Sequence, residues 1–277
     1  MKEHLGESMA NTVVVRHINV PFSCADLSPA GMRIAHLSDL HFCRWSRVLE
    51  TARELLRSLP YDALAVTGDF SDWRRNWRRT VRMMREFFGP IAGNRPIYAT
   101  LGNHDHPRIA EAADMPIRFL RDDSTIHEHR NGLLRIAGVE QLHQHGGDTK
   151  KACLSRDVDL PTVLLAHYPS TVYRLGSARV GLVLSGHTHG GQIRLPHAGC
   201  VWSNDSLPPR LAHGLSRVNG TTLHVSAGIG VSWPLPVRVN CPPEISILTL
   251  DPLTAEDAAP TSENTPIRST PQKTADI

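Results

Sequence analysis

The sequence has few cysteines, almost no lysine and no long apolar segment. Its five cysteines, at positions 24, 43, 153, 200 and 241, are widely spaced and form no CxxC pair. This excludes a disulfide framework and a zinc ribbon, and it favours a reducing compartment. The longest apolar runs have about seven residues, whereas a membrane-spanning helix needs ~20. Because the N-terminal residues also show neither the apolar core of a signal peptide nor a twin arginine, we expect a cytoplasmic protein, with peripheral contact to the inner membrane left open.

The excess of positive over negative charge is small as well. The formal net charge is +3 in 277 residues, too little to indicate nucleic acid as a partner. Lysine occurs only at positions 2, 150, 151 and 273, so the basic residues are nearly all arginine. With 40% hydrophobic residues the chain can bury a sizeable core. We expect one domain over 1–250 and a disordered tail over 251–277, which is rich in Pro, Ser, Thr and charge.

Short apolar runs alternate with helical patterns along the body of the chain. The runs predict strands at 12–20, 32–37, 62–67, 96–100, 162–167, 180–185, 221–227 and 244–250. Segments 46–59 and 72–88 place their apolar residues on one helical face, and the Asn-Gly pair within 127–139 predicts a hairpin turn. This order of elements predicts an α/β domain built on mixed sheets.

Polar side chains follow five of these runs at the point where each strand ends. They are Asp39 and His41, then Asp69 and Asp72, then Asn103, His104 and Asp105, then His167, and finally His187 and His189. Each alone has a structural explanation, since an Asp after a strand is usually a cap or turn and a lone His is usually a satisfied core residue. Because all five groups occupy the edge of an α/β sheet where ligands bind, together they favour one site.

The residue types at these strand ends point to divalent metals. Carboxylate oxygen and imidazole nitrogen suit Mn, Fe and Zn, and no cysteine is among the candidates. The candidate ligands are Asp39, His41, Asp69, Asn103, His167, His187 and His189. Seven ligands exceed the usual protein coordination of one ion but match two ions that share a bridging carboxylate. Two such ions hold a phosphoryl group for in-line displacement.

The order of the motifs resembles that of the calcineurin-like metallophosphoesterase superfamily. D-x-H at 39–41, G-D-x-x-D at 68–72, G-N-H-D at 102–105, His167 and G-H-x-H at 186–189 follow one another as in that superfamily. The segments "GHTHGGQIRLP" and "GIGVSWPLPVRVNCPPE" are similar to a bacterial branch of single-domain phosphodiesterases. The resemblance implies a four-layer α/β/β/α sandwich of two mixed sheets.

The resemblance also implies a role for each candidate residue. Asp39, His41 and His189 would hold one metal, Asn103, His167 and His187 the other, and Asp69 would bridge them together with a water or hydroxide. His104 would act at the leaving-group oxygen as general acid or electrostatic stabiliser, and the Asp72 carboxylate would orient it. Asp105 would be either a supporting group of the site or a cap.

The predicted function is hydrolysis of phosphate esters by two divalent ions, manganese, iron or zinc. Metal-bound hydroxide would attack phosphorus, and diesters or pyrophosphates are favoured over monoesters. The substrate would be a phosphorylated small molecule or a lipid. Alternatives are a UDP-2,3-diacylglucosamine pyrophosphatase of lipid A synthesis, which relatives in the branch suggest, a nuclease, and a binding scaffold without catalysis. No ligand position is missing, which disfavours the scaffold.

Two further features stay open at this stage. Segment 73–88 holds six arginines and one glutamate. Arginine in the first turn opposes the helix macrodipole by ~0.3–1 kcal/mol per charge, so these side chains do not serve helix stability. The segment is either a solvated face or a basic surface for an anionic membrane or a phosphorylated substrate. Arg238 is predicted to contact a phosphate or to close the fold, and His36 is predicted to be structural.

Overall fold

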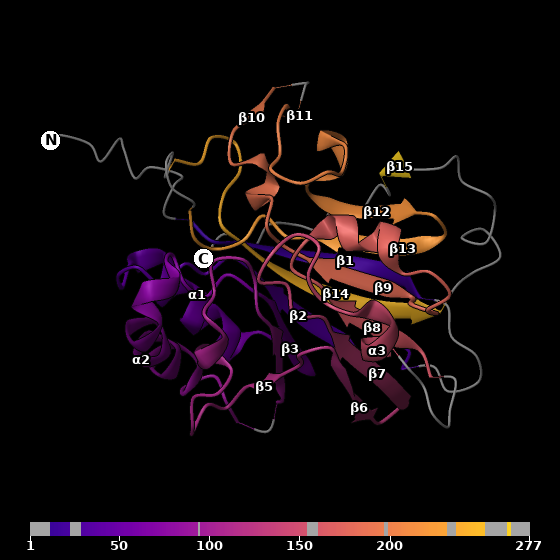
Figure 1. Ribbon diagram of the computed structural model, residues 1–277, viewed down its shortest axis with the longest axis horizontal. Helices are drawn as coiled ribbons and strands as arrows, with labels where there is room; N and C mark the ends of the chain where they lie inside the picture. The colour runs from indigo at the N-terminus through magenta and orange to yellow at the C-terminus, as the bar shows by residue number, and fades with distance from the viewer. Residues whose placement is uncertain are drawn as a thin grey trace, which may run out of the picture.

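The computed structural model describes residues 12–22, 29–93, 95–153, 160–196, 199–231, 237–252 and 265–266. Two β-sheets pack face to face, and helices cover their outer sides (Figure 1). The predicted four-layer α/β/β/α sandwich is confirmed. Within the described ranges, no helix combines the length and the apolar character that crossing a bilayer requires.

The first sheet carries the two long helices. Its strand order is β1 (Val14–Phe22), β14 (Glu244–Pro252), β2 (Arg33–Leu37), β3 (Ala63–Thr67), β4 (Ile97–Thr100) and β5 (Arg118–Phe119). Strands β2 to β5 run parallel, while β14 is antiparallel to β2. Helices α1 (Arg47–Ser58) and α2 (Trp77–Phe88) bury their apolar faces against the outer side of this sheet. Helix α1 begins where the Ser46 side chain accepts a hydrogen bond from the Leu49 backbone N–H.

The second sheet is covered by shorter helical segments. Its order is β15 (Thr265–Pro266), β12 (Gly214–Val218), β13 (Thr221–Val225), β9 (Leu182–Ser185), β8 (Thr162–Leu165), β7 (Gly132–Gly138) and β6 (Asp123–His129). Outside it lie α3 (Thr149–Cys153) and the 3₁₀ turns η4 (Pro169–Arg174) and η6 (Pro209–Leu211). Strands β10 (Arg194–Leu195) and β11 (Gly199–Cys200) form a separate hairpin at the top of Figure 1.

The layer between the sheets is built mainly from apolar side chains, and a histidine pair lies among them. Ile34 and Ala65 of the first sheet and Val163 and Leu182 of the second belong to the same buried cluster. Predicted to be structural, His36 lies in this region, its Nδ1 2.9 Å from Nδ1 of His224 and its Nε2 2.9 Å from Thr67 Oγ1. It is a satisfied buried side chain rather than a ligand.

Most predicted elements are present, with shifted ends. The eight predicted strands correspond to β1, β2, β3, β4, β8, β9, β13 and β14. The helix predicted over 72–88 starts as the 3₁₀ turn η2 (Arg74–Asn76) and continues as α2. In the predicted hairpin the turn residues are Arg130 and Asn131, because Gly132 already pairs with His129.

The predicted tail differs at two places. Strand β14 continues to Pro252, and Thr265–Pro266 pairs with β12 as β15. The rest of 251–277 lies outside the described residues, so its disorder stays a prediction.

Candidate metal centre

The seven candidate ligands converge where strands of both sheets end. Strands β2, β3 and β4 lead into Asp39, Asp69 and Asn103, and β8 and β9 lead into His167 and His187. His189 opens the 3₁₀ turn η5 (His189–Gly191). Six of the seven side chains are buried; Asn103 is half-buried. The strand-end pattern in the sequence therefore corresponds to one place in the fold.

The backbone turns sharply at these ligands. Positive φ angles occur at five of them: Asp39 (51°), His41 (43°), Asp69 (54°), His187 (68°) and His189 (51°). Left-handed backbone is unfavourable for non-glycine residues and persists only where surrounding contacts enforce it, most often at functional sites. The concentration of this strain at the ligands indicates that the turns serve to aim side chains.

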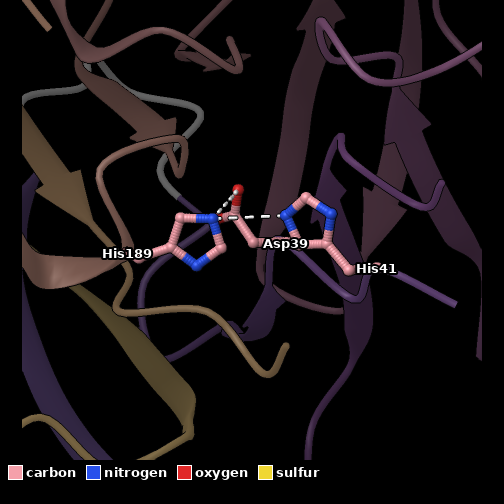
Figure 2. Close-up of side chains that lie close together, drawn as sticks. All are labelled: Asp39, His41 and His189. Carbon is pink, nitrogen blue, oxygen red and sulfur yellow. Dashed lines mark hydrogen bonds and ion pairs between the residues drawn. The ribbon is translucent and has the colours of Figure 1, made fainter. Parts of the chain in front are cut away.

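The first cluster consists of Asp39, His41 and His189, whose side chains point toward one another in Figure 2. Nε2 of His41 lies 3.2 Å from Nε2 of His189, which lies 3.7 Å from Asp39 Oδ1. All three ligand atoms are within 4.8 Å of one another. Burial lowers the pKa of His41 to about 4 and holds that of His189 well below its usual value. Both imidazoles are therefore neutral, and each directs a nitrogen atom at the same point. A divalent cation is the group that two such nitrogen atoms can coordinate.

The second cluster consists of Asp69, His167 and His187. Asp69 Oδ2 is 3.3 Å from His167 Nε2 and 3.8 Å from His41 Nε2, so this carboxylate reaches both clusters. The Asn103 side-chain oxygen lies 3.0 Å from His167 Nε2 and joins the same group. Two buried clusters that share one carboxylate fit two metal sites.

Backbone carbonyls fix the orientation of three of the imidazoles. His41 Nδ1 donates to the Ser71 carbonyl at 3.1 Å, and His167 Nδ1 donates to the Thr67 carbonyl at 2.8 Å. His187 Nε2 donates to the Asn204 carbonyl at 3.3 Å. Histidines that bind metals characteristically donate their other ring N–H in this way. The remaining nitrogen of each ring is therefore available as a ligand.

His104 stands beside the clusters without joining them. Its ring is 5.2 Å from that of His41, and its backbone N–H donates to Asp69 Oδ1 at 2.9 Å. His104 Nδ1 donates at 2.8 Å to the backbone carbonyl of Asp72. The predicted contact with the Asp72 carboxylate is not the one observed, because that carboxylate turns toward His41 Nδ1, 3.9 Å away. Nε2 is thus the His104 nitrogen that can serve a substrate oxygen.

Comparison with known sequences shows which family has this arrangement of residues. Residues 32–191 match the profile of the family described as Calcineurin-like phosphoesterase. The chain belongs to this calcineurin-like phosphoesterase family. It is therefore a metallophosphoesterase, an enzyme that hydrolyses phosphate esters.

Three relatives illustrate how much of this phosphoesterase is shared. The metallophosphoesterase YkuE of Bacillus subtilis is 29% identical, over 79% of each chain. The phosphodiesterase YaeI of Escherichia coli is 27% identical, over 80% of this chain and 83% of its own. The UDP-2,3-diacylglucosamine pyrophosphatase LpxG of Chlamydia trachomatis is 27% identical, over 83% and 86%. The similarity extends beyond the segment that contains the ligands.

The structure of this phosphoesterase adds residues whose contacts the sequence pattern did not reveal. Asp105 accepts the backbone N–H groups of Gly102 (2.9 Å) and Ser71 (2.8 Å), so it ties the Asn103 loop to the loop after β3. Of the two roles left open for Asp105, these bonds correspond to a supporting group of the site, because they reach from one ligand loop to another. The Tyr168 ring packs 4.1 Å from that of His187. No motif marks Tyr168.

Metal binding to this phosphoesterase should release protons, and the number released per protein should depend on pH. Burial opposes a charge on His167, but the Asp69 and Asp39 carboxylates and the Thr67 carbonyl together outweigh it and raise the pKa of His167 to about 9. A ligand imidazole must be neutral, so at about pH 7.5 uptake of two Mn²⁺ releases about one proton from this residue. Above about pH 9, His167 is already neutral before metal binds, so it no longer contributes to the proton release. Calorimetric titration in two buffers of different ionisation enthalpy measures the release; the absence of any component that declines between about pH 7.5 and pH 10 would contradict the assignment.

Proposed function

We propose that this enzyme cleaves phosphodiesters or pyrophosphates in preference to simple monoesters, with two divalent ions at the Asp39 and Asp69 clusters. The observation that carries the proposal is the shared Asp69 carboxylate, within 3.8 Å of nitrogen ligands in both clusters. When bound, two ions held by these clusters would neutralise phosphoryl oxygens and lower the pKa of a water for in-line attack. Manganese, iron and zinc all suit the donor set.

His104 supplies the proton that an alkoxide or phosphate leaving group needs. Its Nδ1–H is engaged by the Asp72 carbonyl, which fixes the ring and leaves Nε2 to act on the leaving oxygen. A binding scaffold without catalysis would tolerate loss of this histidine or of a ligand, and all of them are present. The preference for phosphodiester or pyrophosphate bonds is supported by two relatives, the phosphodiesterase YaeI and the pyrophosphatase LpxG.

A panel of substrates with added Mn²⁺ tests the proposal. It compares a bis-aryl phosphodiester, an aryl phosphomonoester, a cyclic nucleotide and UDP-2,3-diacylglucosamine. We expect kcat/KM for one of the diester or pyrophosphate substrates to exceed that for the monoester at least about tenfold, which corresponds to about 1.4 kcal/mol of transition-state binding. A monoester preference would overturn it. Activity that survives exhaustive chelation would overturn the two-ion centre itself. A dominant activity on UDP-2,3-diacylglucosamine would select the lipid A alternative.

We further propose that the arginine face of α2 contacts an anionic lipid surface. Its arginines are exposed, and among the described residues none of them forms an ion pair with a carboxylate. Trp77 stacks on His106 and lies under the Arg78 guanidinium, and Trp73 is exposed at the start of the segment. A cationic helix with aromatic residues at its edge is suited to the headgroup region of a bilayer.

Vesicle co-sedimentation tests the lipid contact. Binding to vesicles with anionic lipid should fall strongly in the triple Arg→Gln variant at 75, 79 and 82 and should be absent with neutral vesicles. The matched control removes the same charge elsewhere, at the exposed Arg118, Arg130 and Arg210. Equal binding by both variants would refute the proposal and leave the segment as a solvated helix face.

A further inference from the structure

Arg238 is a partly buried arginine whose donors all face the protein. Its guanidinium donates to the carbonyl oxygens of Gly230 (from Nε, 3.0 Å), Ala227 (2.8 Å), Gly228 (3.2 Å) and Cys241 (3.3 Å). Of the two roles predicted for it, contact with a substrate phosphate does not fit these bonds. The carbonyls belong to two segments, the loop after β13 and the segment before β14. Arg238 therefore joins two pieces of backbone that have no regular structure of their own.

The first of these segments encloses the strained ligands Asp39 and His41. The backbone N–H of Ile229 donates to the Ser38 carbonyl at 3.1 Å, and that of Gly230 donates to the Asp39 carbonyl at 2.6 Å. A Cβ on Gly228 would lie 2.8 Å from Asp39 Cβ, and one on Gly230 would lie 3.0 Å from His41 Cβ. The loop is in direct contact with the backbone that carries both ligands. Arg238 binds the carbonyls of this loop. Its forked guanidinium therefore fixes the loop against the left-handed backbone of Asp39 and His41.

The second segment reaches the third ligand of the same cluster. Arg238 binds the Cys241 carbonyl, and the Cys241 thiol donates to the His189 carbonyl at 3.3 Å. Cys241 Sγ also packs against Gly190, where a Cβ would lie 2.8 Å away. Arg238 is thus two contacts away from the backbone of Asp39, His41 and His189. The imidazoles of the second cluster are oriented by different groups, the carbonyls of Thr67 and Asn204. The clusters meet at the His187 backbone N–H, which donates to the Asp39 carboxylate at 3.1 Å.

We propose that Arg238 is a positioning residue for one of the two metal sites, the cluster of Asp39, His41 and His189, and that it acts on that site selectively. Its guanidinium binds backbone carbonyls, and in the described part of the chain it forms no hydrogen bond to a ligand side chain. It holds the Ala227–Gly230 loop and the Cys241 backbone in the places that set the left-handed turns of the three ligands. Losing it releases those turns and leaves the second cluster intact.

Metal titration of the full-length, metal-free protein tests this selectivity. We expect the wild type to bind two equivalents of Co²⁺, followed by its visible absorption. In Arg238→Met one equivalent should keep its affinity and the other should weaken by about 10–100-fold, the usual cost of removing a group that orients ligands. Arg238→Lys should also weaken it, because an ammonium cannot reproduce the guanidinium fork.

Single-site backgrounds assign the affected site. In His187→Ala, where the first cluster is the intact one, Arg238→Met should abolish most of the remaining binding. In His41→Ala, where the second cluster keeps its ligands, the same substitution should change nothing. An equal effect in both backgrounds would contradict the proposal.

Arg95 provides the matched control. It also donates to backbone carbonyls, including that of Leu59 at 2.9 Å, and it stacks on Tyr61, but at the end of α1 away from the clusters. Arg95→Met should lower the unfolding midpoint and retain both equivalents. Loss of Co²⁺ binding in Arg95→Met that matches the loss in Arg238→Met would mean general destabilisation and would overturn the proposal.

Gly228→Ala acts on the same loop while leaving Arg238 in place. Its φ of +71° and the nearby Asp39 side chain make a methyl group costly there. We expect the same selective weakening, which keeps the inference testable if the Arg238 variants fail to fold. Normal binding of both ions by Gly228→Ala would then overturn it. The inference rests on the two-ion centre of the proposed function, and the titrations distinguish failure of one from failure of the other. Fewer than two equivalents bound by the wild type would contradict the two-ion centre. Two equivalents bound with unchanged affinity by folded Arg238 variants would contradict only the role of Arg238.

Discussion

Asp69→Asn should lower turnover of an aryl phosphodiester by about a thousand-fold or more. The carboxylate reaches nitrogen ligands of both clusters, so its loss removes a negative charge that both metal sites share. A loss of ~4 kcal/mol of transition-state stabilisation corresponds to about three orders of magnitude in rate. The substitution preserves shape, so circular dichroism should be unchanged. Steady-state kinetics with saturating Mn²⁺, together with metal analysis of the dialysed protein, measure the effect.

An exposed aspartate on β6 supplies the control for this substitution. Asp123→Asn makes the same chemical change on the far strand of the second sheet and should leave turnover within about twofold, since exposed substitutions rarely perturb a distant site. In Asp69→Asn, His167 also loses the carboxylate that does most to raise its pKa, so that pKa should fall. A variant that keeps both ions and near-normal turnover would refute the bridging role.

His104→Ala should reduce kcat by about 10²–10⁴-fold, the range typical of a lost general acid, without reducing metal content. The backbone N–H that donates to Asp69 is retained in alanine, so the ligand set stays in place. The reduction should be smaller for a nitrophenyl leaving group, which departs readily as an anion, than for an alkyl one. Comparing kcat for diesters with these two leaving groups measures the difference.

His106→Ala is the matched control, because His106 is two residues away and stacks on Trp77 rather than facing the clusters. It should leave both rates unchanged. Equal losses on the two leaving groups in His104→Ala would mean that His104 stabilises charge and does not donate a proton.

The fold could be predicted well from strand and helix patterns because its core strands are short, apolar and buried on both faces. Strands β2, β3, β8 and β9 are of this kind. Strand β12 was missed because "GLSRV" contains glycine and a charged residue and acquires its strand form by pairing with β13. Strand β10 is only two residues long and depends on β11. Strands of this kind are specified by their partners more than by their own composition.

The ligands could be predicted because each comes from a strand end, a position that the local sequence identifies. The groups that orient them could not. Asp72 contributes its backbone carbonyl, which carries no residue signature. Arg238 binds carbonyls that lie from 3 to 11 residues away along the chain. Tyr168 faces His187 only because two neighbouring strands end at the same level. Contacts through the main chain depend on tertiary geometry, which motif spacing does not encode.

The placement of the ligands on both sheets has a consequence for how the loaded protein unfolds. His41 follows a strand of the first sheet and His189 a strand of the second, 148 residues apart in sequence. An ion held by both would be a removable cross-link between the two halves of the sandwich, and it would restrict the unfolded chain as a disulfide closing a long loop does. Separation of the sheets would then require the ion to dissociate, so we expect the unfolding rate of the loaded enzyme to depend on metal release as well as on the apolar interior.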